Sequence, residues 1–187
     1  MKVEQFVMAY GAEQDRLRAM LPEAFESLRP VLRINAEIRD DSSAYVEFNT
    51  AAEADGRRGW INIGYWEDAV FERCGRTVTF KAGDLKISYT GVGLEGSCPA
   101  EKDNDGCYFQ GKGWRPAELI TANKEFCDCE FQWEISGGAG GKSIGATLPA
   151  IPQEQVNHYP EQDLTVENAS VIPCEQVLGA YKVIFER

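Results

Sequence analysis

The chain has 187 residues, of which 30 are acidic and 19 basic, so its net charge is −11 with the single histidine neutral. A protein this acidic is not expected to bind nucleic acid, which is recognised through Lys and Arg contacts to phosphates, or an anionic membrane surface. The hydrophobic fraction of 43% is too high for a disordered chain. The length suits one domain over residues 1–187. Because the N-terminus lacks a signal-peptide core and no apolar run reaches about 18 residues, a cytoplasmic protein is predicted.

The hydrophobic pattern predicts a mainly β (α+β) fold with one early helix. The first strand, Val3–Tyr10, is rich in Val, Phe and Tyr. A helix over Ala12–Leu21 follows, with acidic residues in its first turn and a proline at its end. A short second helix is expected near Pro116–Thr121. Further strands are expected at Val31–Ile38, Tyr45–Ala51, Trp60–Trp66, Arg76–Ala82, Leu85–Val92, Phe126–Ile135 and Gln176–Phe185. Turns at 40–43 and 54–56 separate the first three of them.

Three neighbouring predicted strands alternate apolar and polar side chains. The polar faces hold Arg33, Asn35 and Glu37 on one strand, Tyr45, Glu47 and Asn49 on the next, and Asn62 on the third. In an open antiparallel sheet such faces contact water. In a closed barrel they line a lumen, where polar groups form a ligand pocket. The alternation is compatible with both arrangements.

The histidine and cysteine residues favour structural roles over chemistry. His158 lies in a loop-like, proline-flanked segment, which argues against a Ser-His-Asp triad and against a His-rich metal site. Cys127 and Cys129 share the apolar face of their strand and are interpreted as small hydrophobic residues. Together with Cys98 and Cys107 they could also form a zinc site, although the spacing matches none of the usual frameworks. No metal and no cofactor is expected.

Short motifs follow one another in a defined order along the chain. Phe6–Tyr10 leads into Asp15–Glu23, and Arg29–Arg33 begins the next strand. These segments are followed by Tyr45-Val46-Glu47, by Gly59–Tyr65, by Gly75-Arg76 and finally by Cys174–Phe185. In the order and spacing of these motifs the chain resembles the acetoacetate decarboxylases, over roughly residues 1–80 and the last strand.

The resemblance implies a closed or nearly closed antiparallel β-barrel with a ligand cavity. Enzymes of that family decarboxylate a β-keto acid through a lysine Schiff base. The reactive amine must be neutral near pH 7, whereas an ordinary lysine titrates near 10.4, and desolvation or a neighbouring cation can supply the shift. By the resemblance, Glu47 matches a glutamate facing the cavity. The Pro-Lys-Lys motif that carries the reactive lysine is absent, and Lys81 is the nearest lysine to its place.

These observations predict a divergent acetoacetate decarboxylase-like protein with a small-molecule site. The candidate residues are Glu47 and Lys81 for catalysis and Asn35, Tyr45, Asn62 and Arg76 for ligand binding. Lys86 and Lys124 are the other lysines beside predicted strands that could form an imine. The expected ligand is a small organic acid or carbonyl compound, with homo-oligomer formation as a further option. Two other functions stay open: a non-catalytic small-molecule-binding barrel, and an acidic β domain that binds another protein.

Overall fold

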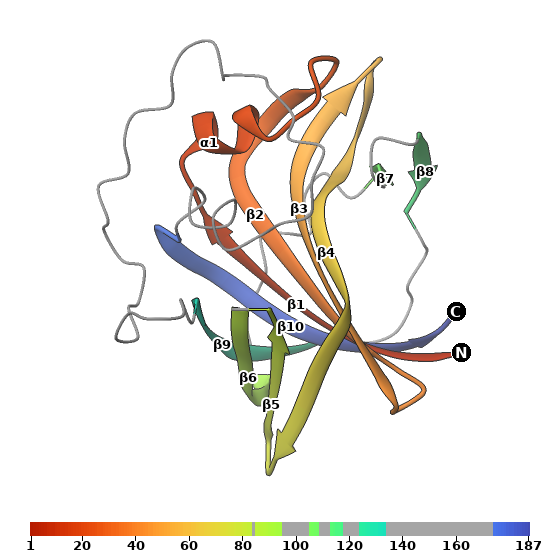
Figure 1. The fold of residues 1–187 in the computed structure, drawn as a ribbon, viewed down its shortest axis with the longest axis vertical. Helices are drawn as coiled ribbons and strands as arrows, with labels where there is room; N and C mark the ends of the chain where they lie inside the picture. Colours follow the sequence, from red (N-terminus) through yellow and green to blue (C-terminus); the bar gives the residue numbers. More distant parts are fainter. Residues whose placement is uncertain (84, 95–104, 109–112, 118–123, 134–173) are drawn as a thin grey trace.

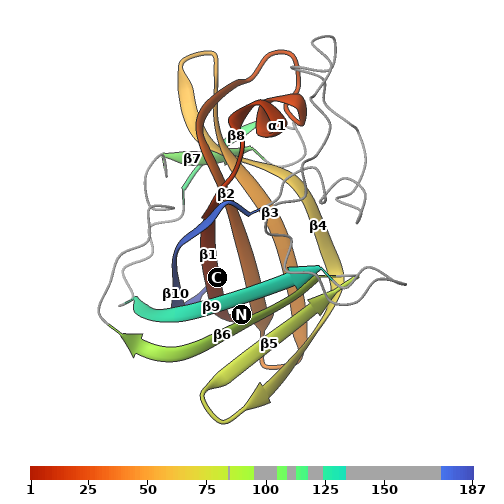
Figure 2. The ribbon, with the colours of Figure 1, turned by 90° about the vertical axis from the view of Figure 1, so that its left-hand side faces the viewer.

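The computed structural model describes residues 1–83, 85–94, 105–108, 113–117, 124–133 and 174–187. Its main feature is one strongly bent sheet accompanied by a short helix (Figures 1 and 2). The elements in chain order are β1 (Lys2–Gly11), α1 (Gln14–Ala19), β2 (Glu26–Arg39), β3 (Ser43–Ala54), β4 (Arg57–Cys74), β5 (Thr77–Ala82), β6 (Leu85–Leu94), β7 (Gly106–Tyr108), β8 (Trp114–Pro116), β9 (Glu125–Trp133) and β10 (Gln176–Glu186). The predicted mainly β fold with an early helix is therefore confirmed.

The sheet closes into a ring because β3, at one end of the strand order, also pairs with β4 near the other end. The strand order is β3-β2-β1-β10-β9-β6-β5-β4-β7-β8, and β3 also pairs with β4. The pairings are antiparallel, apart from a short parallel contact between β4 and β7. The long β4 pairs with β3 up to Ala69 and with β5 from Val70 onwards. Its bend therefore joins the upright strands of Figure 2 to the crossing strands β5, β6 and β9.

Two tight turns set the register of β2, β3 and β4. Asp40 and Asp41 connect β2 to β3 with φ of 49° and 54°, and Asp55 and Gly56 connect β3 to β4 with φ of 52° and 72°. Asp and Gly are the residues that tolerate this left-handed region in hairpin turns. Both turns lie where the sequence predicts them, so the three strands that carry the polar faces are held side by side.

The interior of the ring is apolar. Phe6 of β1 contacts Phe80 of β5 and Tyr89 of β6, with ring centroids 5.4 and 5.1 Å apart. Because β1 and β5 are not neighbours in the sheet, these contacts cross the inside of the ring. Leu17 of α1 and Cys127 of β9 are buried in the same cluster. The predicted core position of Cys127 is thus confirmed. Each fully buried large side chain in this cluster contributes about 1.5–3 kcal/mol of hydrophobic stabilisation.

Several element boundaries differ from the prediction. The helix α1 is shorter than expected. The strand β4 continues beyond Trp66 through the charged residues Glu67 and Asp68, because backbone pairing with β3 and β5 holds it there. Pro116 lies in β8, so the expected second helix is wrong at that residue, and positions 118–121 of that helix lie outside the described residues. No helix in the described part of the chain is long and apolar enough to span a membrane.

Candidate functional site

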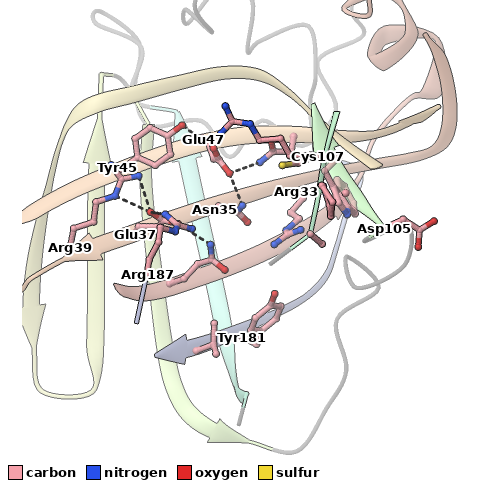
Figure 3. Close-up of a pocket in the computed structure, with 18 of the residues that line it drawn as sticks. Arg33, Asn35, Glu37, Arg39, Tyr45, Glu47, Asp105, Cys107, Tyr181 and Arg187 are labelled. Atoms are coloured by element: carbon pink, nitrogen blue, oxygen red, sulfur yellow. Dashed lines mark hydrogen bonds and ion pairs between the residues drawn. The ribbon is translucent and has the colours of Figure 1, made fainter. Parts of the chain in front are cut away.

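A polar pocket of about 770 Å³ lies on the outer face of β1, β2 and β3 (Figure 3). Successive residues of a strand point to opposite faces of the sheet, so the pocket-facing residues alternate with core residues such as Phe6 and Ile34. The pocket is also bordered by the β7–β8 hairpin and by β10. Its polar wall consists of Gln5, Arg33, Asn35, Glu37, Tyr45, Glu47 and Asn49. The polar faces thus line a pocket, while the inside of the ring is filled by the apolar cluster.

Two glycines bring the β7–β8 hairpin against β4. A Cβ atom on Gly59 would lie 2.5 Å from the carbonyl oxygen of Gly106, and a Cβ on Gly106 would lie 2.3 Å from Trp114. Only glycine fits contacts this close. The contact at Gly59 allows β4 and β7 to pair, with Trp60 opposite Cys107. The close packing therefore places the hairpin at the rim of the pocket.

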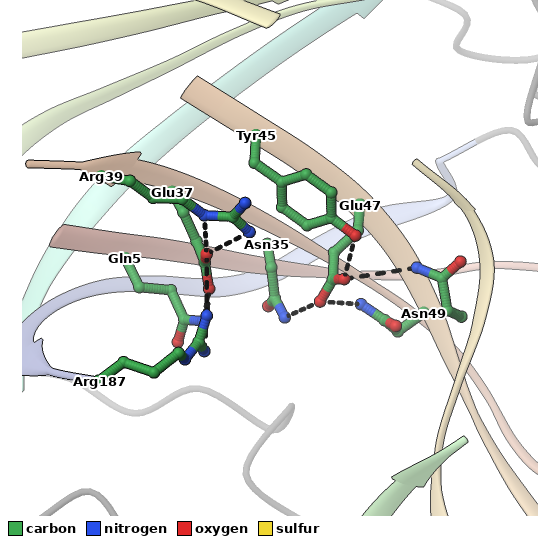
Figure 4. A network of polar contacts seen from close by, with 9 residues as sticks. Gln5, Asn35, Glu37, Arg39, Tyr45, Glu47, Asn49 and Arg187 are labelled. Carbon is green, nitrogen blue, oxygen red and sulfur yellow. Dashed lines mark hydrogen bonds and ion pairs between the residues drawn. The ribbon is translucent and has the colours of Figure 1, made fainter. Parts of the chain in front are cut away.

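Glu47 is the centre of a hydrogen-bond network on the pocket wall (Figure 4). Its carboxylate accepts hydrogen bonds from Asn35 Nδ2 at 2.7 Å, Tyr45 OH at 2.8 Å, Asn49 Nδ2 at 3.1 Å and Asn62 Nδ2 at 3.4 Å. A carboxylate offers about four acceptor positions. The four donors occupy them, so Glu47 fixes the orientation of its neighbours.

Tyr45 enters this network as a protonated donor. Burial raises the pKa of its hydroxyl well above the ordinary value, and the charge of Glu47 and the hydrogen bond to it raise the pKa further. The guanidinium of Arg39 lies 4.3 Å from the centre of the Tyr45 ring. Tyr45 therefore stays protonated and donates a hydrogen bond to Glu47 at all physiological pH values.

The second buried carboxylate of the pocket, Glu37, is neutralised by cations. Glu37 accepts a hydrogen bond from Gln5 at 3.0 Å and one from Arg39 Nε at 2.9 Å. Arg187 reaches the same carboxylate at 3.3 and 3.4 Å. Only 4% of Glu37 is exposed, so the two guanidinium groups compensate a charge that burial would otherwise make costly.

Three buried atoms on the pocket wall have no hydrogen-bond partner among the described residues. They are Nε of Arg33, Oδ1 of Asn35 and Nε1 of Trp60. The guanidinium of Arg33 lies 5.3 Å from the centre of the Trp60 ring, in a cation–π arrangement. A buried polar atom without a partner costs roughly 1–3 kcal/mol. Such atoms are rare in folded proteins, and here all three belong to residues lining one pocket.

The structure brings together four of the predicted site residues and separates two. Asn35, Tyr45, Glu47 and Asn62 form the network described above. Lys81 and Arg76 are exposed, and neither lines the pocket. Lys81 lies on β5, which β4 separates from β3, and Arg76 lies in the turn between β4 and β5. The catalytic role of Lys81 and the binding role of Arg76 therefore gain no geometric support.

Sequence reasoning missed other pocket residues. Arg33 shares its strand face with Asn35 and Glu37, so the alternation was the signal that could have placed it in the pocket. Trp60 has the same alternation signal relative to Asn62. Arg187 carried no comparable signal, because it comes from the other end of the chain. Lys124, one of the lysines considered for an imine, lines the pocket with its Nζ 5.1 Å from the centre of the Tyr181 ring.

The described residues contain no group of three or more His, Cys, Asp or Glu side chains arranged to hold a metal ion. Cys127 is buried in the core, whereas Cys107 is exposed at the pocket rim. Cys98, the fourth cysteine of the alternative zinc arrangement, and His158 lie outside the described residues.

Comparison with solved structures identifies the fold. An acetoacetate decarboxylase from Legionella pneumophila superposes with a TM-score of 0.63 at 12% identity, covering 98% of this chain and 81% of the other. An acetoacetate decarboxylase-like enzyme from Sphingomonas wittichii gives 0.58 at 9% identity, covering 98% and 87%. The enduracididine biosynthesis enzyme MppR in complex with pyruvate gives 0.51 at 10% identity, covering 98% and 84%. No family model and no curated protein sequence matches the chain. The polar pocket therefore belongs to a chain with the acetoacetate decarboxylase-like fold.

Proposed function

We propose that this chain binds a small carboxylic acid or carbonyl compound in the polar pocket around Glu47. The observation that carries the proposal is the set of buried polar atoms on the pocket wall that have no hydrogen-bond partner among the described residues. Concave sites of about 300–1,000 Å³ with a few convergent polar groups are typical of small-molecule binding, and this pocket has about 770 Å³. The solved MppR complex with pyruvate is consistent with such a ligand in this fold.

The charges of the pocket favour an anionic ligand. Glu37 is already compensated by Arg39 and Arg187, and the charge of Glu47 is stabilised, though not cancelled, by four neutral donors. Arg33 is buried to 92% (8% exposed) and has no carboxylate partner in the described part of the chain. A guanidinium recognises a carboxylate with two parallel hydrogen bonds, so a carboxylate ligand supplies the missing charge. The described lining holds five Arg or Lys and four Asp or Glu side chains, a small excess of positive charge that contrasts with the net charge of −11.

A catalytic version of the function depends on Lys124. It is the lysine that the described pocket lining contains. Attack of its neutral amine on a ketone or aldehyde would form a C=N bond with loss of water, and the resulting imine would serve as an electron sink for carbanion chemistry. A protein without this step would be a binding module with the same pocket.

The first experiment is a ligand panel. Purified full-length protein is titrated calorimetrically with C3–C6 2-oxo acids, 3-oxo acids, 2-hydroxy acids and uncharged ketones. We expect saturable binding of at least one acid class and weaker binding of the ketones. Absence of binding across the panel would contradict the proposed function.

The second experiment separates catalysis from binding. The protein is incubated with the panel carbonyl compounds and sodium borohydride, which reduces an imine to a stable secondary amine, and the adduct is located by peptide mass mapping. Lys124→Gln tests the pocket lysine, and Lys86→Gln serves as the control. An adduct at Lys124 that the Lys124→Gln variant loses supports the enzyme. Binding without any adduct supports the non-catalytic module.

A further inference from the structure

The orientation of the Asn35 side chain is determined by its neighbour. Its amide contacts Glu47 at 2.7 Å, and a carboxylate in this network can only accept. The group facing Glu47 must therefore be Nδ2, and the carbonyl oxygen Oδ1 is the end that finds no partner within the described part of the chain. A buried carbonyl oxygen is complementary to a hydrogen-bond donor. The ligand that fits this part of the pocket must donate a hydrogen bond.

The other two unpaired atoms require an acceptor. Arg33 Nε and Trp60 Nε1 are both N–H groups that only donate, and both residues are more than nine-tenths buried. Arg33 and Asn35 lie two residues apart on the same face of β2, a separation of about 6.6 Å along the strand. Their side chains point toward the same space in Figure 3. The acceptor and the donor of the ligand therefore contact neighbouring side chains on one strand face.

We infer that the pocket selects carboxylic acids with a hydroxyl group beside the carboxylate, namely 2-hydroxy acids. The carboxylate accepts hydrogen bonds from Arg33 and Trp60, and the hydroxyl donates to Asn35 Oδ1. The keto oxygen of a 2-oxo acid is an acceptor and would face Asn35 Oδ1, which is also an acceptor. Both oxygens would then lack a hydrogen-bond donor. An ammonium group would also supply a donor, but its other N–H bonds would need acceptors, and those of Glu47 beside Asn35 are already occupied by four donors. This inference rests on the proposed function and assigns the ligand class within it.

A matched ligand series tests the inference on the unaltered protein. The series is 2-hydroxy-4-methylpentanoate, 2-oxo-4-methylpentanoate, 4-methylpentanoate and leucine, measured by titration calorimetry under one buffer condition. We expect the hydroxy acid to bind about tenfold more tightly than the other three, the effect of one hydrogen bond to an otherwise unpaired buried group. Equal affinities, or tightest binding of the oxo acid or of leucine, would overturn the inference and leave the proposed function standing. Failure of all four to bind would remove the inference, and failure of the wider acid panel would also remove the proposed function.

Two variants assign the contacts. Arg33→Gln is expected to weaken binding of the hydroxy acid by about tenfold to a hundredfold, because it removes a charged donor, while Arg18→Gln on helix α1, which does not line the pocket, leaves the affinity unchanged. Trp60→Phe keeps an aromatic ring and removes only the N–H, so a loss of about fivefold to tenfold is expected. Circular dichroism confirms that each variant is folded. Unchanged affinity in folded Arg33→Gln would overturn the assigned carboxylate contact.

Discussion

Strands β1, β2 and β3 carry two different surfaces on their opposite faces. One face packs Phe6 against Phe80 and Tyr89 inside the ring. The other face holds Glu47 and Glu37 with their donors in the pocket. Both faces are buried, but the first is stabilised by apolar packing and the second by hydrogen bonds and charge compensation. Burial alone therefore does not distinguish the core face from the site face of these strands, whereas the pairing of polar groups does.

The largest expected effect is on the apolar face. Phe6→Ala removes a fully buried ring from the centre of the aromatic cluster, so we expect a loss of about 3–5 kcal/mol in the free energy of unfolding. Gln5→Ala, the neighbouring residue on the pocket face, loses one hydrogen bond to Glu37 and is expected to cost about 0.5–1.5 kcal/mol. Urea unfolding measures both. Equal losses would contradict the difference between the two faces.

The pocket face is tested most strongly at Glu47. Glu47→Gln preserves the shape but turns one acceptor into a donor that faces two of the four existing donors. We expect a loss of about 1–3 kcal/mol in stability and the loss of acid binding in the calorimetric titration, because Asn35 is no longer held in place. Glu26→Gln, an exposed position on β2, is the control and should change neither. Intact binding in Glu47→Gln would show that the network does not position the ligand contacts.

A third prediction concerns Glu4, a buried carboxylate on the apolar face near the chain termini. Burial raises its pKa, but hydrogen bonds and charges from Arg73 and Lys182 outweigh burial and hold the pKa below the ordinary value of 4.5. Arg73 forms two hydrogen bonds to it, at 2.5 and 3.3 Å. Just below pH 4.5, Glu4 therefore stays ionised in the folded state, whereas the same carboxylate in the unfolded chain is already largely protonated.

The sign of the pH effect follows from this depressed pKa. Its contribution to stability is complete above about pH 4.5 and is lost as the pH falls through the folded-state pKa. Glu4→Gln should flatten the decline of the thermal midpoint below about pH 4.5, whereas Glu26→Gln should leave the slope unchanged. An identical slope in Glu4→Gln and the unaltered protein would contradict the role of this ion pair.

The smallest predicted effect is a change in labelling rate. Cys107 is exposed at the pocket rim, and Cys74 is exposed at the end of β4, where it does not line the pocket. Saturating ligand from the panel should slow alkylation of Cys107 by iodoacetamide several-fold and leave Cys74 unchanged, as followed by peptide mass mapping. Equal rates with and without ligand at Cys107 would place the bound ligand away from the hairpin.

Local sequence patterns predict most of the strands and part of the site. Alternation identifies the polar faces of β2 and β3, and the Asp and Gly residues at 40–43 and 54–56 locate the turns that align them. These two features suffice to bring Asn35 and Tyr45 to Glu47. Asn62 depends in addition on the register shift between Phe48 and Asn49, which no local pattern reveals.

Other parts of the site depend on closure of the ring. Arg187 reaches Glu37 only because β10 pairs with β1, and Lys124 borders the pocket because β9 follows β10 in the sheet. Such contacts between distant segments leave no trace in a local pattern. The resemblance-based choice of Lys81 rested on sequence proximity to an absent motif, whereas its place on β5 lies beyond β4 from Glu47.

A crystal structure of the protein with 2-hydroxy-4-methylpentanoate would show directly whether the polar pocket holds a 2-hydroxy acid. We expect the ligand on the outer face of β2, with its carboxylate within hydrogen-bond distance of Arg33 and its hydroxyl within hydrogen-bond distance of Asn35 Oδ1. A ligand bound elsewhere, or one in this pocket with neither contact, would show that the pocket does not recognise 2-hydroxy acids in this way.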